Sequence, residues 1–164
     1  RTGELYKEAL MRSLYFCPGS NLFVRAELVR KIDGFDEDFN RNQDMEFLAR
    51  VLEHCKLAYV EDRTLIIHYE NKTGGKTTYR KMVDLDDFYL SKFKSRIEAL
   101  APAERNKVYK YFALERFRYS IKMHQMKDGL DNCRKNKVGC ILLTRYVLYM
   151  VYRYITKKSV GFKI

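Results

Sequence analysis

The stretch Asp33-Gly34-Phe35-Asp36-Glu37-Asp38-Phe39-Asn40-Arg41-Asn42-Gln43-Asp44-Met45-Glu46 is the most informative part of this sequence. Before it, residues 26–32 are expected to form a short helix, with Gly34 placed where a left-handed C-cap would lie. After it, apolar residues recur at helical spacing from Met45 to about His54. The stretch is therefore expected to be an acid-rich turn that leads directly into a second helix.

Outside this segment, the two halves of the chain differ in their pattern. In the first half, short apolar runs at 21–24, 57–60 and 64–69 predict strands. After residue 79 the sequence favours helices only. One helix is expected to end before Pro102, which would open the next helix at its first turn. That next helix is apolar on two faces, which is typical of a helix packed between neighbours. Asp128-Gly129 is expected to close it, before a third helical segment from about 131 to 155.

Charge is also distributed unevenly between the halves. Residues 1–79 carry 12 Lys and Arg against 13 Asp and Glu, and residues 80–164 carry 20 against 8, so the net charge of +11 belongs to the second half. A basic half-chain indicates either an anionic partner or a solvated helical surface. Because the chain begins with Arg1 and shows no signal-peptide pattern, we expect it to be a piece of a longer protein.

Four cysteines at positions 17, 55, 133 and 140 form no C-x-x-C pair and have no histidine at zinc-finger spacing. We interpret them as reduced and mostly structural, which favours a cytoplasmic protein without zinc.

The acidic residues of 33–46 allow two interpretations. Asp36, Asp38 and Asp44 are residue types that are common in turns and at helix N-termini for structural reasons alone. A carboxylate in the first turn of a helix is, however, also suited to general-base chemistry. Asp44 would lie near the positive end of the helix dipole, which favours its ionised form.

Three motifs in order resemble the family 2 glycosyltransferases of the GT-A fold. Residues 19–25 (Gly-Ser-Asn-Leu-Phe-Val-Arg) are followed by Gly34-Phe35-Asp36-Glu37-x-Phe39 and then by Gln43-Asp44-x-Glu46-x-x-x-Arg50. In that family a strand with a glycine precedes G-G-F-D-E-x-F and an E-D-x-E/D-x-x-x-R helix start. This chain departs from the pattern at Asp33, where the family usually has glycine, and at Gln43, where it usually has glutamate.

The resemblance implies a helix-rich α+β fold. Residues 1–79 would be the acceptor-side, C-terminal half of a GT-A-like α/β domain, and residues 80–164 a basic helical extension. It further implies an inverting transfer of a sugar from a nucleotide-sugar donor to a saccharide or lipid-linked acceptor, in cell-surface polysaccharide synthesis. Asp44 would be the catalytic base, with Asp36, Glu37 and Gln43 at the acceptor.

The same resemblance implies a divalent metal, Mn²⁺ or Mg²⁺, for which His68 would be the last ligand; the alternative is a histidine that ends a surface strand. The loop 71–78 has the composition of a phosphate-contacting lid, with Lys76 and Thr77 at the phosphate, or of an ordinary surface loop. The D-x-D motif that holds metal and diphosphate in the family is not found in the expected context. The chain is therefore expected to be inactive alone, with most metal ligands upstream.

Residues 138–155 are apolar nearly all round but contain Arg145 and Arg153, which makes a poor transmembrane span. They fit either an interfacial helix on an anionic membrane or a core helix that packs on its neighbour. The protein would then lie in the cytoplasm, peripheral to the inner face of the plasma membrane. The alternative function is a basic helical module that docks on an anionic membrane or on nucleic acid without catalysis. Nucleic acid is the less expected partner because no known binding motif is present.

Overall fold

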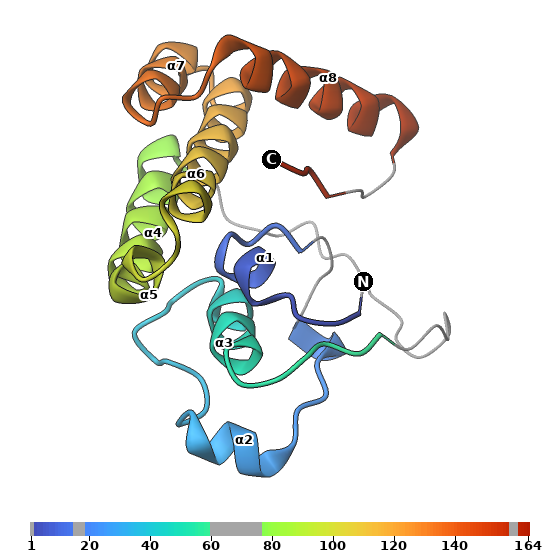
Figure 1. Ribbon diagram of the computed structural model, residues 1–164. Helices are drawn as coiled ribbons and strands as arrows, with labels where there is room; N and C mark the ends of the chain where they lie inside the picture. The colour runs from blue at the N-terminus through green and yellow to red at the C-terminus, as the bar shows by residue number, and fades with distance from the viewer. Residues whose placement is uncertain (1, 15–18, 60–76, 158–160) are drawn as a thin grey trace. The chain divides into compact units, whose positions relative to one another are not determined.

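The computed structural model describes residues 2–14, 19–59, 77–157 and 161–164 (Figure 1). Contacts divide the chain into two compact units, Arg1–Gly75 and Lys76–Ile164, which we call the N-terminal unit and the C-terminal unit. The change in sequence pattern placed the division after residue 79.

The N-terminal unit is built on two packed helices. Its elements are α1 (Tyr6–Leu10), the 3-10 helix η1 (Gly19–Asn21), α2 (Ala26–Lys31) and α3 (Gln43–Leu52). Helix α1 packs against α3, and α3 follows the expected helical spacing. The two helices bury a small apolar core, because one face of each is apolar. The buried apolar residues of this unit are Leu5, Ala9, Leu10, Leu14, Phe39, Phe47, Leu48, Ala49, Val51 and Leu52.

The predicted α+β class is wrong for the described residues, which form helices and no strand. In the run 21–24, Asn21 ends η1, the rest has no regular structure, and Phe23 is 91% exposed. In the run 57–60, Leu57 makes only an isolated antiparallel bridge with Gly3. The run 64–69 lies outside the described residues. A β-prone run without a partner strand gains neither ladder hydrogen bonds nor a packed face, so propensity alone does not make it a strand. The GT-A-like α/β architecture is therefore not what these residues adopt.

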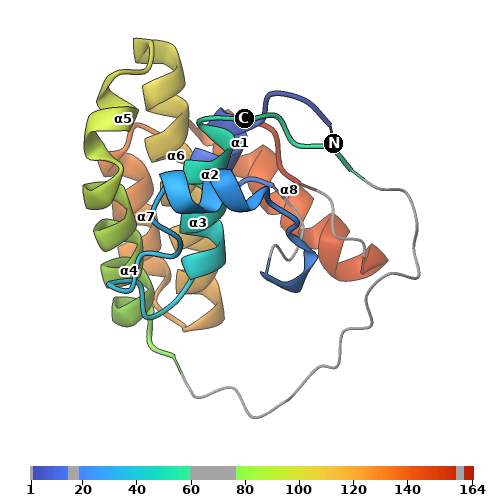
Figure 2. The same ribbon diagram turned by 90° about the horizontal axis from the view of Figure 1, so that it is seen from below.

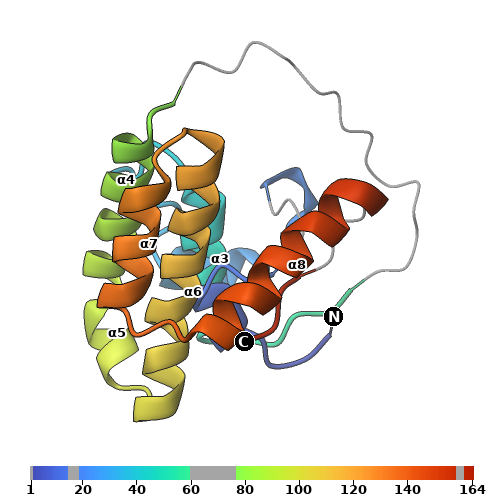
Figure 3. The same cartoon turned by 90° about the horizontal axis from the view of Figure 1, so that it is seen from above.

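The regular structure of the C-terminal unit, where it is described, consists of helices. It contains α4 (Tyr79–Lys92), α5 (Lys94–Glu98), α6 (Pro102–Lys122), α7 (Met126–Lys135) and α8 (Cys140–Thr156). Helices α4, α6 and α7 lie side by side (Figures 2 and 3). Two sequence signals explain where the helices begin. The Thr78 side chain caps α4 by accepting a hydrogen bond from the Lys81 amide at 3.3 Å, and Pro102 opens α6 as predicted.

Helix α6 is the centre of this unit. It packs against α4, α5 and α7 and buries residues from both of its predicted apolar faces, among them Phe112 and Leu114. Tyr89 of α4 stacks on Phe112, with ring centroids 5.6 Å apart. The expectation of a helix packed between neighbours is confirmed.

Three helix boundaries differ from the sequence-based expectation. The helix expected to end before Pro102 is interrupted at the buried Phe93, between α4 and α5. Gly129, expected to end a helix, lies inside α7, where a small residue is required by close packing. The third helical segment is two helices, because Lys137 adopts a left-handed conformation (φ 53°) that interrupts the chain between α7 and α8.

Buried charges of the C-terminal unit are paired. Asp86 of α4 has no exposed surface, and its carboxylate accepts a hydrogen bond from Nε of Arg116 at 3.4 Å. The same guanidinium donates to Asp87 at 2.7 Å. Pairing of this kind is what allows a carboxylate to be buried at all. In the part of the chain that is described, no helix combines the length and the apolar character that crossing a bilayer would require.

Gly129 is the point of closest approach between α7 and α6. A Cβ atom there would lie 2.0 Å from Ser120 Oγ, 2.7 Å from Ser120 Cβ and 3.2 Å from Phe117 Cα. We therefore expect Gly129→Ala to force the helices apart and to lower the free energy of unfolding by about 1–3 kcal/mol, as overpacking does. Urea unfolding followed by circular dichroism would measure the change. Gly139→Ala is the control, since a Cβ there meets nothing within 4 Å; equal midpoints for the two variants would contradict this packing.

The thiol of Cys133 is expected to be unreactive. It is buried against α6, where it approaches the Ala113 carbonyl oxygen at 3.6 Å, and burial raises its pKa to about 11. Near pH 8 it is almost wholly protonated, and the thiolate is the reactive form. Alkylation with iodoacetamide, read by mass spectrometry, should modify the exposed Cys55 and Cys140 far faster than Cys133. Comparable rates in the folded protein would show that Cys133 is accessible.

Candidate functional site

The turn between α2 and α3 is held by the side chain of Arg50. Its guanidinium donates from Nη1 to the Ile32 carbonyl oxygen at 2.5 Å and from Nη2 to the Gly34 carbonyl oxygen at 2.7 Å. Ile32 is the C-cap of α2, a helix in which no residue is fully buried, and Gly34 lies in the turn that follows. One arginine on α3 therefore fixes the position of the preceding helix end.

Glu46 completes this arrangement from one turn earlier on α3. Its side chain is 4% exposed and that of Arg50 is 15% exposed, and Arg50 Nη2 donates to Glu46 Oε2 at 2.8 Å. Phe35, from the turn, stacks on Phe47 of α3 with ring centroids 4.4 Å apart. A guanidinium that donates hydrogen bonds to a carboxylate and to two carbonyl oxygens at once forms a rigid link between them. We call Glu46, Arg50 and the two carbonyl groups the Arg50 clamp.

The backbone of the turn explains one departure from the family pattern. Asp33 and Gly34 both have left-handed conformations, each with φ of 62°. Glycine adopts this conformation at little cost, and aspartate tolerates it better than most residues. Asp33 therefore occupies a position where the family's usual glycine would also fit.

Asp44 lies in the first turn of α3 and is partly exposed. Its Oδ1 accepts a hydrogen bond from the Met45 amide at 2.9 Å. Its Oδ2 faces Gly19, where a Cβ atom would lie 3.8 Å away. The structure thus brings together the glycine of the first motif and the aspartate of the third. No side chain at position 19 covers the second carboxylate oxygen.

The other predicted acceptor residues lie along the same segment, with different roles. Asp36 closes the turn, because its Oδ1 accepts from the Asp38 amide at 3.0 Å. Glu37 and Gln43 are exposed. Asp36 therefore shapes the backbone, whereas Glu37 and Gln43 present polar side chains that a ligand could contact.

Two of the remaining predicted site residues, His68 and Lys76, lie outside the described residues. Thr77 is described, partly exposed, just before the Thr78 cap of α4. Among residues 2–14, 19–59, 77–157 and 161–164, no group of three or more His, Cys, Asp or Glu side chains could hold a metal ion. The described side chains do not fit a metal site, and we assign no chemical step to a metal held by them.

Sequence reasoning did not identify the clamp as such. Glu46 and Arg50 have the i,i+4 spacing of a helical ion pair, which is visible in the sequence. What the spacing does not show is that the arginine continues past the glutamate to two carbonyl oxygens of the turn 32–34. The proximity of Gly19 to Asp44 was likewise visible only as the order of two motifs.

Comparison of this chain with protein-family models, with curated proteins and with solved structures identifies no match.

The clamp predicts a specific local instability. Arg50→Ala removes the donors for Ile32 and Gly34 and leaves the buried Glu46 without its partner, which should cost about 3–5 kcal/mol. Hydrogen-exchange mass spectrometry should show faster exchange in peptides that cover α2, the turn and α3, with the C-terminal unit unchanged. Arg30→Ala, at an exposed arginine of α2, is the control. Unaltered protection of 26–52 in Arg50→Ala would mean that the turn does not depend on the clamp.

Proposed function

We propose that this chain is the acceptor-side part of an inverting glycosyltransferase in which Asp44 is the general base. The observation that carries the proposal is the geometry of its carboxylate. One oxygen is fixed by the Met45 amide, and the other faces Gly19 at the start of a helix held by the Arg50 clamp.

In the proposed reaction, a hydroxyl oxygen of the acceptor attacks the anomeric carbon of a nucleotide sugar. The new C–O bond forms as the bond from that carbon to the diphosphate oxygen breaks, and the bonding electron pair leaves with the nucleoside diphosphate. The hydroxyl proton passes to Oδ2 of Asp44. Attack from the side opposite the leaving group inverts the anomeric configuration. A base within hydrogen-bond reach of the acceptor contributes typically 10²–10⁴-fold to such a rate.

Two structural facts support this role for Asp44. The carboxylate of Asp44 lies in the first turn of α3, where the Met45 amide donates to its Oδ1 and holds the side chain in place. The clamp keeps the helix start in place, and positioning errors of about 1 Å cost large factors in rate. Exposed Glu37 and Gln43 are proposed as acceptor contacts on the same segment.

The wider proposal concerns the protein to which this activity would belong. The donor is proposed to be a nucleotide sugar and the acceptor a saccharide or lipid-linked precursor of a cell-surface polysaccharide, handled in the cytoplasm. Groups that hold the diphosphate, including any Mn²⁺ or Mg²⁺, would come from residues other than those described. The three motifs in order, and the position of Gly19 close to Oδ2 of Asp44, support this assignment.

Asp44→Asn tests the base directly. In the complete gene product that carries these residues, assayed with nucleotide sugars and a divalent cation, we expect kcat to fall about 10²–10⁴-fold because the amide cannot accept the proton. Nucleotide-sugar binding should be retained. Asp33→Asn is the matched control, since asparagine tolerates the same left-handed backbone. Turnover of Asp44→Asn within a few-fold of the unmodified protein would exclude Asp44 as the base.

A further inference from the structure

Helix α8 carries an apolar stripe on its outer face. Ile141, Leu148 and Ile155 are 80%, 63% and 71% exposed, and Val151 and Tyr152 are also exposed. Their spacing places them within roughly 120° of the helix circumference. We call these five residues the α8 stripe. Proteins in solution rarely leave several large apolar side chains exposed on one helix face without a partner.

The opposite face of α8 is fixed to the rest of the C-terminal unit. Tyr146, with no exposed surface, donates its hydroxyl to Glu115 Oε1 of α6 at 2.6 Å. Its ring also meets the ring of Phe162, edge to face, at 5.0 Å. The segment 161–164 runs beside α8, on the side that carries Tyr146 (Figures 1 and 3). These contacts hold the Tyr146 face of α8 toward Glu115 and Phe162, which leaves the α8 stripe on the opposite face.

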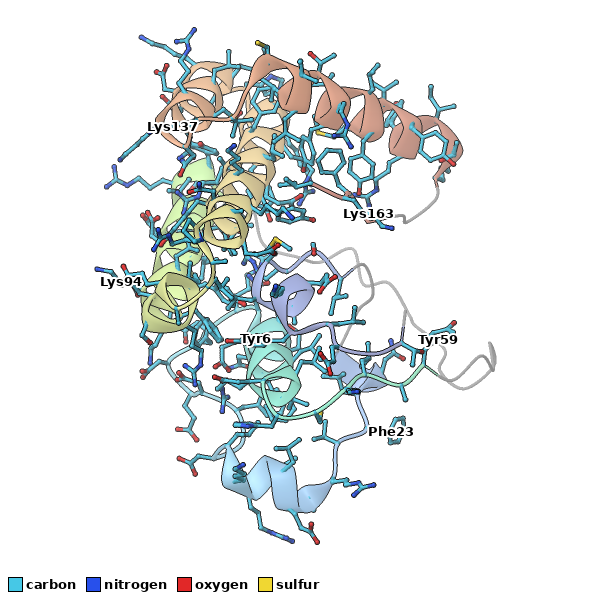
Figure 4. The ribbon with its side chains drawn as sticks, in the orientation of Figure 1. Tyr6, Phe23, Tyr59, Lys94, Lys137 and Lys163 are labelled. Atoms are coloured by element: carbon cyan, nitrogen blue, oxygen red, sulfur yellow. The ribbon has the colours of Figure 1, made fainter. Side chains whose placement is uncertain are left out.

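Charge around the stripe has one sign. Residues 132–164 contain eight Lys and Arg and no Asp or Glu, and α8 itself contains no acid. Lys137 and Lys157, both exposed, stand before and after the helix, and Arg145 is exposed beside the stripe. Lys137 and Lys163 are labelled in Figure 4. The surroundings of the stripe are therefore complementary to an anionic partner.

The combination of aliphatic side chains and cations distinguishes between anionic partners. Phosphates of a nucleic acid would satisfy the cations but would leave Leu148 and Ile155 against a polar backbone. A second copy of the chain would cover the stripe but would bring two surfaces of like charge together. A bilayer with anionic headgroups offers both an acyl boundary for the stripe and negative charge for the cations. Tyrosines beside such a stripe suit the headgroup depth.

We propose that α8 lies on the surface of an anionic phospholipid bilayer, with the α8 stripe inserted at the headgroup–acyl boundary and with Lys137 and Lys157 on the headgroups. The helix binds parallel to the membrane plane and does not span it. This surface is separate from Asp44, so it holds whether or not the chain belongs to a glycosyltransferase.

Vesicle flotation tests the proposal with the 164-residue chain. Vesicles of phosphatidylcholine alone are compared with vesicles that also contain about one third phosphatidylglycerol, at low and at high salt. Binding is expected only to the anionic vesicles and should weaken strongly in high salt, since headgroup attraction is screened. Absence of binding to the anionic vesicles overturns the proposal.

Two double variants separate the apolar and the charged contributions. Leu148→Asp with Ile155→Asp places acids in the stripe and should weaken anionic-vesicle binding about ten-fold or more. Phe23→Asp, at an exposed aromatic residue of the N-terminal unit labelled in Figure 4, is its control. Both changes are at exposed positions, and circular dichroism should show unchanged helix content.

Lys137→Asn with Lys157→Asn removes one cation before α8 and one after it. Both residues have positive φ, which asparagine tolerates. Each lost charge should weaken binding about five-fold. Lys31→Asn with Lys94→Asn is the matched control, since both lysines are exposed and lie on α2 and α5. Vesicle binding that is equal in all variants would refute the assignment to α8.

Two further measurements expose the competing partners. Light scattering would show a dimer that disappears in Leu148→Asp/Ile155→Asp, and fluorescence anisotropy would show binding to a labelled oligonucleotide at physiological salt. Either result without flotation on anionic vesicles would overturn the membrane assignment. Flotation that is lost in the stripe variant and kept in the Phe23→Asp control supports it.

Discussion

The Arg50 clamp is the constraint on which the N-terminal unit depends. No residue of helix α2 is fully buried, and its apolar Leu28 and Val29 are only half-buried, so apolar packing holds the helix weakly. Hydrogen bonds from one guanidinium to the carbonyl oxygens of Ile32 and Gly34 take over that task. Because Arg50 stands on α3, it also fixes the turn relative to the helix that begins with Gln43 and Asp44. The clamp thus ties the turn 32–34 to the same helix that carries the proposed base.

The C-terminal unit is held together by helix packing and by a buried ion pair. Its core is a three-helix arrangement of α4, α6 and α7, in which the carboxylate of Asp86 is buried only because Arg116 reaches it. Helix α8 is attached to this core by Tyr146 and Glu115. Glu115 also binds Arg118 at 3.1 Å. Burial and the hydrogen bond to Glu115 both raise the pKa of the Tyr146 hydroxyl, so it remains a donor throughout the physiological range. Because the Tyr146 face of α8 is held to Glu115, the α8 stripe lies on the face that remains exposed.

Helices were predictable from the sequence where local signals are strong. The strands predicted at 21–24 and 57–60 are not formed by the residues that the structure describes. Gly34 and Pro102 marked real helix ends, and the period of α3 was visible in its apolar residues. The run with Phe23 has high strand propensity, but a strand requires a partner that no local signal supplies. Gly129 was wrongly predicted to end a helix. A glycine is needed there because Ser120 of another helix leaves no room for a side chain. Such a reason exists only in three dimensions.

The candidate site, too, was predictable from the sequence only in part. The order of the motifs indicated Asp44, and the structure adds that Gly19 lies close to its Oδ2, which order alone could not give. Asp36 was placed in a turn, and its bond to the Asp38 amide shows how it closes that turn. The link from Arg50 to the turn joins residues 16 and 18 positions apart in the chain. Contacts at that separation depend on how the intervening chain folds, which sequence spacing does not show.

The close approach of α6 and α7 has a consequence for the order of folding. The two helices are joined by the short turn 123–125, so the contact of Gly129 with Ser120 closes only a small loop. Closing a small loop costs little chain entropy, and contacts between near neighbours in sequence form early. The pair Asp86 and Arg116 spans 30 positions and closes a much longer loop. By this argument the α6–α7 hairpin is the natural nucleus of the C-terminal unit, onto which α4 and α8 are added through contacts of longer separation.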